Sequence, residues 1–195
     1  MIHGVYGLDA VRRHNNITKI LKALEKQGMY TREFSYLRAL VIFTYFKCLR
    51  KRWAKRLKAQ LKDGDSIVAH SFGCAVVWEL LKQLQEEKSS LQLKNIYLFN
   101  ASLERELQFS KDNCHKIFVF YHPGDNLLTL ATYLPNNIMG DMGKVGYQYK
   151  THNIINIKLE TPDCNSILQH DCFSQPEYVD YYATFIKKAE KIDDH

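Results

Sequence analysis

The sequence lacks several features that would place it in a specialised class of protein. It has no internal repeat, no low-complexity tract and no linker rich in proline, glycine or serine. Its longest apolar run, residues 39–46, is much shorter than the ~20 residues that cross a bilayer. Residues 1–10 contain no basic stretch followed by an apolar core, so we expect no signal peptide. With 195 residues, 46% hydrophobic and 25% charged, the chain is expected to form one domain over residues 1–195.

Sequence motifs for common cofactors and metal ions are also absent. There is no GxGxxG motif, no phosphate-binding P-loop and no HExxH or CxxC pair. Cys164, His170 and Cys172 lie close together in the sequence, but their spacing fits none of these metal-binding patterns. We therefore predict that the protein uses no metal ion and no organic cofactor.

The number and spacing of the cysteines favour reduced thiols. The chain has five of them, at Cys48, Cys74, Cys114, Cys164 and Cys172. Oxidised scaffolds usually carry an even and dense set of cysteines. An odd number without a CxxC pair therefore predicts free thiols and a cytoplasmic location.

Acidic residues are missing from one long segment. Residues 34–62 contain nine basic residues and no acidic one, whereas the rest of the chain has 18 basic and 21 acidic residues. The net charge of +6 therefore comes from this segment, and the chain is not uniformly basic as many nucleic-acid-binding domains are. Two interpretations of its most basic part, Lys47–Lys58, are open. It is either the solvated face of a helix with Trp53 and Leu57 turned inward, or a surface for lipid headgroups, nucleic acid or an acidic partner.

Strand-like and helix-like segments alternate along the chain. This order is typical of an α/β domain with a mainly parallel sheet flanked by helices. Strands are expected at residues 29–36, 66–69, 95–100, 116–121 and 154–159. Helices are expected at residues 16–27, over most of 38–61, and at 73–87 and 178–191. Residues 125–151 show no clear pattern and are expected to be irregular apart from one helix.

The strongest indication of chemistry is the five-residue stretch Ala69-His70-Ser71-Phe72-Gly73. It follows a strand-like segment and begins a helix-like one. This is the context of a nucleophile elbow, a tight bend that needs small residues two positions before and two positions after the serine. Ala69 and Gly73 meet that need. The pattern therefore predicts that Ser71 is a nucleophile, although a helix N-cap role would also fit this residue.

With this elbow, the chain resembles the α/β-hydrolase superfamily. Asp125 follows the strand-like residues 116–121, and His170 lies between the last expected strand and the last expected helix. The order Ser, Asp, His is that of the family. The resemblance covers nearly the whole chain and implies a catalytic triad of Ser71, Asp125 and His170 with little or no cap domain. Asp125 also fits a simple turn.

The resemblance also implies an oxyanion hole. Ile2-His3-Gly4 is similar to the family's His-Gly loop, which follows an early central strand. One donor would then be the backbone N–H of Phe72, and the other that of Val5 or Tyr6. Only two residues precede His3, which predicts that the strand before this loop is reduced or truncated.

Two positions of the triad have competing candidates. The acid could be Asp112 or lie within residues 100–102, because some members of the family place it one strand earlier. The chain has eight histidines, and those that compete with His170 are His122 and His152. Supporting roles without a direct part in the chemistry are expected for His3, His70 and Asp171.

These features predict a serine hydrolase that cleaves a small carboxylic ester or thioester through an acyl-enzyme. In this mechanism His170 takes the proton of Ser71, and Asp125 holds the other imidazole nitrogen. Two different functions stay open. The protein could be a catalytically inactive member of the same fold that binds an acidic partner through its basic helix. It could also be an interfacial lipase whose residues 39–58 touch a membrane.

Overall fold

Six parallel strands form the centre of the structure. The computed structural model describes residues 4–9, 16–35, 47–109, 112–131, 140–161, 164 and 169–192. In this part of the chain one sheet has the strand order β2-β1-β3-β4-β5-β6. Its strands are β1 (Val5–Asp9), β2 (Thr31–Ser35), β3 (Ser66–His70), β4 (Leu93–Phe99), β5 (Cys114–Tyr121) and β6 (Ile154–Lys158). All five neighbouring pairs are parallel, which confirms the predicted fold class.

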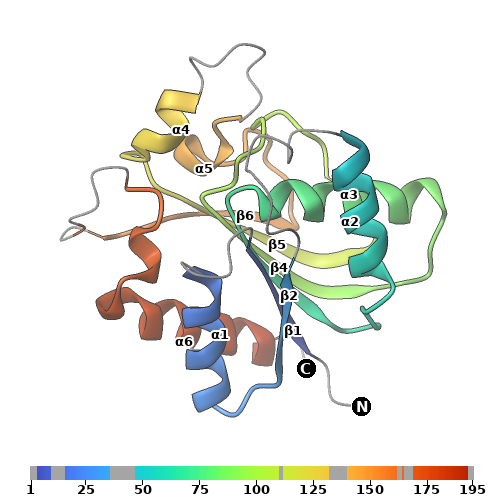
Figure 1. The fold of residues 1–195 in the computed structure, drawn as a ribbon, viewed down its shortest axis with the longest axis horizontal. Helices are drawn as coiled ribbons and strands as arrows, with labels where there is room; N and C mark the ends of the chain where they lie inside the picture. Colours follow the sequence, from blue (N-terminus) through green and yellow to red (C-terminus); the bar gives the residue numbers. More distant parts are fainter. Residues whose placement is uncertain are drawn as a thin grey trace.

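Helices cover both faces of this sheet (Figure 1). One face is covered by α1 (Asn16–Lys26) and α6 (Pro176–Ile192), and the other by α2 (Lys47–Lys58) and α3 (Gly73–Glu86). Along β3 the side chains alternate between these layers, because successive residues of a strand point to opposite faces. Ile67 packs with α3, and Val68 packs with α1 and α6. None of the helices in the described ranges is long and apolar enough to span a membrane.

The described part of the region predicted to be irregular contains two short helices rather than one. These are α4 (Asn126–Ala131) and α5 (Met142–Val145), and a short 3₁₀ helix, η2 (Cys172–Ser174), precedes α6. The remaining expected elements are present with ends that shift by a few residues, except that residues 38–46 lie outside the described part of the chain.

Strand β1 was not expected, and it corrects the prediction about the start of the chain. It begins directly after Gly4 and lies between β2 and β3, with Val5 opposite both Thr31 and Ser66. A strand therefore follows the His-Gly pair instead of preceding it. Gly7 in its middle obscures the strand pattern, but the packing needs it. A Cβ there would lie 2.6 Å from the Ile17 side chain, so glycine lets α1 approach the sheet.

Candidate active site

Ser71 lies in a sharp turn between β3 and α3. The strand ends at His70 and the helix begins at Gly73, so the strand–turn–helix bend predicted for residues 69–73 is confirmed. Ser71 has a φ of 52°, a left-handed conformation that costs energy for a residue with a side chain. Its N–H donates to the carbonyl of Phe99 at 2.9 Å, which ties the turn to the end of β4. The surrounding structure therefore holds Ser71 in a strained and defined position.

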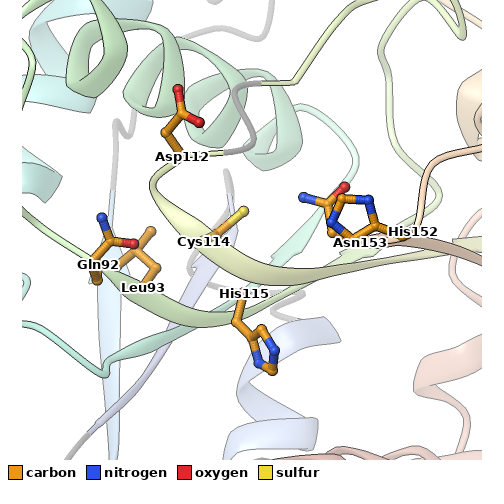
Figure 2. A pocket seen from close by; sticks show the side chains of 7 residues that line it. All are labelled: Gln92, Leu93, Asp112, Cys114, His115, His152 and Asn153. Atoms are coloured by element: carbon orange, nitrogen blue, oxygen red, sulfur yellow. The ribbon is translucent and has the colours of Figure 1, made fainter.

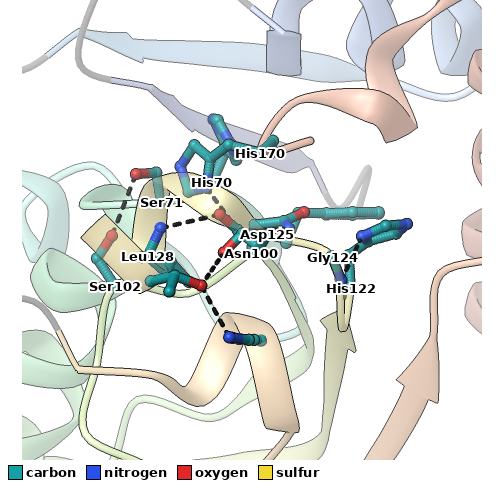
Figure 3. A network of polar contacts seen from close by, with 12 residues as sticks. His70, Ser71, Asn100, Ser102, His122, Gly124, Asp125, Leu128 and His170 are labelled. Atoms are coloured by element: carbon teal, nitrogen blue, oxygen red, sulfur yellow. Dashed lines mark hydrogen bonds and ion pairs between the residues drawn. The ribbon is translucent and has the colours of Figure 1, made fainter. Parts of the chain in front are cut away.

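Asp125 and His170 form a buried hydrogen-bonded pair at the same edge of the sheet. Asp125 lies between β5 and α4, and His170 lies just before η2. The distance from His170 Nδ1 to Asp125 Oδ2 is 2.7 Å (Figure 3). A carboxylate only accepts hydrogen bonds, so Nδ1 carries the proton and Nε2 keeps its lone pair. Nε2 is buried without a hydrogen-bond partner in the described part of the chain, which leaves it available to accept a proton.

Two further donors hold the Asp125 carboxylate in place. Asn100 Nδ2 donates to Oδ2 at 2.9 Å, and the backbone N–H of Leu128 donates to Oδ1 at 3.0 Å. Asp125 and Asn100 are both fully buried. Each carboxylate oxygen is therefore satisfied, and the carboxylate cannot turn away from His170 without breaking a buried hydrogen bond.

His70 supports the loop that carries His170. Its Nε2 lies 3.2 Å from the backbone carbonyl of His170, and the two ring centroids are 4.8 Å apart. Burial lowers the pKa of His170. The hydrogen bond to Asp125 opposes this change, and the neighbouring His70 adds to it. The net direction is a lowered pKa, so His170 is neutral at neutral pH and can act as a base.

Ser71 has a partner that no sequence pattern indicated. Its Oγ lies 3.2 Å from the Oγ of Ser102, a buried residue in the loop after β4. Figure 3 shows this contact beside the pair formed by His170 and Asp125. The same loop carries Asn100, so it contacts both the serine and the acid. The sequence suggested residues 100–102 only as an alternative position for the acid of the triad. In the structure Asn100 instead donates to Asp125, and Ser102 contacts Ser71.

Asp112 and His152, which compete for the acid and the base of the triad, lie far from Ser71. Both line a cavity of about 370 Å³ together with Gln92, Leu93, Cys114, His115 and Asn153 (Figure 2). This cavity lies where β4, β5 and β6 begin, at the edge opposite to Ser71, so neither residue can replace Asp125 or His170. Burial raises the pKa of the Cys114 thiol to about 12, so this thiol is protonated and a poor nucleophile.

His122 follows β5 on the same side as Asp125, but its Nδ1 accepts a hydrogen bond from the N–H of Gly124 at 3.1 Å. Burial lowers its pKa. The His122 ring thus helps to shape the turn that leads into Asp125.

Among the described residues, no group of three or more histidine, cysteine or acidic side chains is arranged to hold a metal ion.

The prediction that Val5 or Tyr6 supplies an oxyanion donor is wrong. Both lie at the beginning of β1, and Val5 is opposite Ser66, the first residue of β3, whereas Ser71 follows the last. The N–H of Val5 donates to the carbonyl of Tyr30 at 3.0 Å. Residues 10–15, which follow β1 in the sequence, lie outside the described ranges. Phe72 does lie next to Ser71 at the start of α3.

Two cysteines near His170 are bonded to each other. Cys164 and Cys172 form a disulfide, with their Cα atoms 5.6 Å apart. The prediction of free thiols is therefore wrong for this pair, because two cysteines eight positions apart in the sequence lie within bonding distance of each other. Cys48, Cys74 and Cys114 keep their thiols. A cytoplasmic location, which rests on the expectation of free thiols, stays a prediction.

Comparison with known families agrees with this geometry. Residues 52–188 match a family described as "Alpha/beta hydrolase of unknown function (DUF900)". The matched segment contains Ser71, Asp125 and His170. No curated protein matches the chain. Because the match covers well over half of the 195 residues, the chain belongs to this family of α/β hydrolases.

Proposed function

We propose that the protein is a serine hydrolase that cleaves a carboxylic ester or thioester through an acyl-enzyme. The observation that supports this most is the buried bond of 2.7 Å between His170 Nδ1 and Asp125 Oδ2. It fixes the tautomer in which Nε2 is a base, at the sheet edge where the strained elbow presents Ser71. A serine hydroxyl is a weak nucleophile on its own and needs such a base.

Each proton transfer in the proposed reaction has a named donor and acceptor. Ser71 Oγ attacks the acyl carbon while His170 Nε2 takes its proton, and Asp125 stabilises the imidazolium that forms. The carbonyl oxygen becomes an oxyanion, for which the backbone N–H of Phe72 is the proposed donor. The oxyanion then collapses, and the leaving alcohol or thiol takes the proton from His170. Water repeats these steps on the acyl-enzyme and releases the acid.

Labelling with a fluorophosphonate probe tests this proposal, because the probe reacts only with an activated serine. We expect the native chain to be labelled at Ser71, and labelling to be lost in Ser71→Ala and His170→Ala. His152→Ala is the matched control, since His152 lies at the opposite edge of the sheet. Its labelling should equal that of the native chain. If the folded native chain is not labelled, or if labelling survives in Ser71→Ala, the proposal fails.

The pH dependence of labelling follows from the lowered pKa of His170. Because only the neutral imidazole can take the proton, the rate should stay on its plateau as pH falls through 6.5 and drop only below it. Below pH 6.5 protonation of His170 is less favourable in the folded chain than in the unfolded chain. The free energy of unfolding should therefore fall as pH decreases below 6.5. Labelling rates measured from pH 5 to 8 check the first expectation, and an inflection of the rate above pH 6.5 would contradict it. Urea unfolding over the same pH range checks the second.

Ser102 should slow the reaction of Ser71. In the structure the hydroxyls of Ser71 and Ser102 share a hydrogen bond in which either can be the donor, and His170 Nε2 has no partner in the described part of the chain. The prediction takes Ser71 as the donor, whose proton must then be redirected to His170. Removing a hydrogen bond worth about 0.5–1.5 kcal/mol from this resting state should raise the labelling rate of Ser102→Ala about 2- to 10-fold. Ser90→Ala, at an exposed serine between α3 and β4, should leave the rate unchanged. A slower Ser102→Ala variant would show that Ser102 assists the reaction instead.

A further inference from the structure

Helix α2 separates its apolar and cationic residues onto two faces. Its inward face consists of the buried residues Trp53, Ala54 and Leu57, and the helix packs against α3. Its outward face carries four exposed cations: Lys51, Arg52, Lys55 and Arg56. We call these four side chains the cationic face of α2. The inward orientation of Trp53 and Leu57 predicted from the sequence is therefore confirmed, and the cationic face is exposed to solvent.

The charges on the cationic face are not balanced locally. Lys58, at the end of the helix, forms an ion pair with Glu87, but none of the four cations has an acidic partner within the described ranges. Lys51 and Lys55, like Arg52 and Arg56, are four residues apart, so like charges repel one another on adjacent turns. An external anion bound at the cationic face would reduce this repulsion between like charges.

The shape and setting of this face favour a lipid surface as that anion. The four cations occupy six consecutive residues, about 9 Å of helix, which matches a few neighbouring headgroups better than an extended polynucleotide. Outside residues 34–62 the chain carries 18 basic and 21 acidic residues, so the excess of positive charge is confined to this part of the chain. The sequence just before the helix, residues 39–46, is apolar in composition, which suits contact with lipid.

We propose that the cationic face of α2 binds the surface of a bilayer that contains anionic phospholipids. Cations near such a surface each strengthen binding severalfold, and salt screens this attraction within about 10 Å at 0.1 M. The interaction does not use Ser71, His170 or Asp125, so it is independent of the proposed hydrolase activity.

Vesicle flotation with the full chain tests this proposal. The vesicles contain phosphatidylcholine alone or with about 30% phosphatidylserine, a fraction that gives a clearly negative surface. We expect binding to the anionic vesicles only, and a loss of that binding as the salt concentration rises. The variant K51Q/R52Q/K55Q/R56Q should bind at least about 10-fold more weakly, because it loses four contacts with the surface. Glutamine has nearly the same helix propensity as lysine and arginine, so α2 should stay folded.

A matched variant distinguishes binding through the cationic face of α2 from binding that depends only on the total charge of the protein. K22Q/K26Q/K88Q/K150Q removes the same charge from exposed lysines elsewhere and should retain most of the binding. Equal losses in the two variants, or no binding of the native chain at low salt, would overturn the proposal. A single-stranded oligonucleotide that bound the same four residues more tightly than the vesicles would overturn it in favour of a nucleic acid. Ser71→Ala should bind as the native chain does, so a failure of the proposed activity would leave this result unaffected.

Discussion

Replacing Asp125 by asparagine is expected to lower the labelling rate of Ser71 about 10⁴-fold while the protein stays folded. Asparagine has the same shape as aspartate, and its oxygen can still accept the bond from the N–H of Leu128. Its amide group would, however, face two donors, His170 Nδ1–H and Asn100 Nδ2, where the carboxylate accepts from both. The imidazole would then favour the tautomer with its proton on Nε2, which cannot act as the base.

The control for this substitution is Asp112→Asn. Asp112 is the competing acid of the sequence pattern, and it lines the cavity at the opposite edge of the sheet. The Asp112→Asn protein should be labelled at the native rate. Rates are measured with the fluorophosphonate probe, and the folded state of each variant is checked by its urea unfolding curve. A folded Asp125→Asn protein that labels within tenfold of the native rate would rule out the proposed role of Asp125.

A large loss of stability is expected from Gly143→Ala. A methyl group on Gly143 would enter the backbone of Asn100 and Ala101, which cannot move aside as the end of a flexible side chain can. Overpacking of this kind costs about 1–3 kcal/mol or more. Gly143 also links two loops of the site, because its N–H donates to Ala101 and its carbonyl accepts from His122, both at 2.9 Å. Displacing it should therefore shift Asn100 away from Asp125 and slow labelling as well.

Urea unfolding and probe labelling measure the two effects of Gly143→Ala. Gly28→Asn is a suitable control, since nothing lies within 4 Å of a Cβ at Gly28 and asparagine tolerates its positive φ. The control should change the unfolding midpoint little and leave labelling unchanged. A Gly143→Ala protein with native stability would mean that the two loops are not held together as closely as the structure indicates.

The sequence predicted those parts of the fold that depend on local patterns. β4 and β5 each contain a continuous apolar run, residues 96–99 and 117–121, as strands buried on both faces do. The elbow at Ser71 is encoded by small residues around one turn. β1 was missed because Gly7 breaks its apolar pattern for the sake of packing against α1. Residues 125–151 were only partly anticipated, since α4 and α5 are too short to show helical periodicity.

The site itself was predicted unevenly. Asp125 and His170 could be proposed only from the order of residues in the resembling family, and the structure brings these two into contact. Asn100 and Ser102 could not have been found from the sequence. They contact Asp125 and Ser71 across 25 and 31 residues, and no local pattern reports such a distant contact. Val5 and Tyr6 were assigned wrongly because residues 5–9 were not recognised as a strand.

The parallel sheet also determines how late in refolding the candidate site is assembled. Neighbouring parallel strands cannot be joined by a hairpin, so each pair in the sheet forms between segments that are distant in the sequence. His170 meets Asp125 across 45 residues and His70 across 100. Chains with many such distant contacts fold slowly compared with helical bundles of similar size. After dilution from denaturant, helical circular dichroism should therefore recover first, and reactivity of Ser71 should return only with the slowest phase.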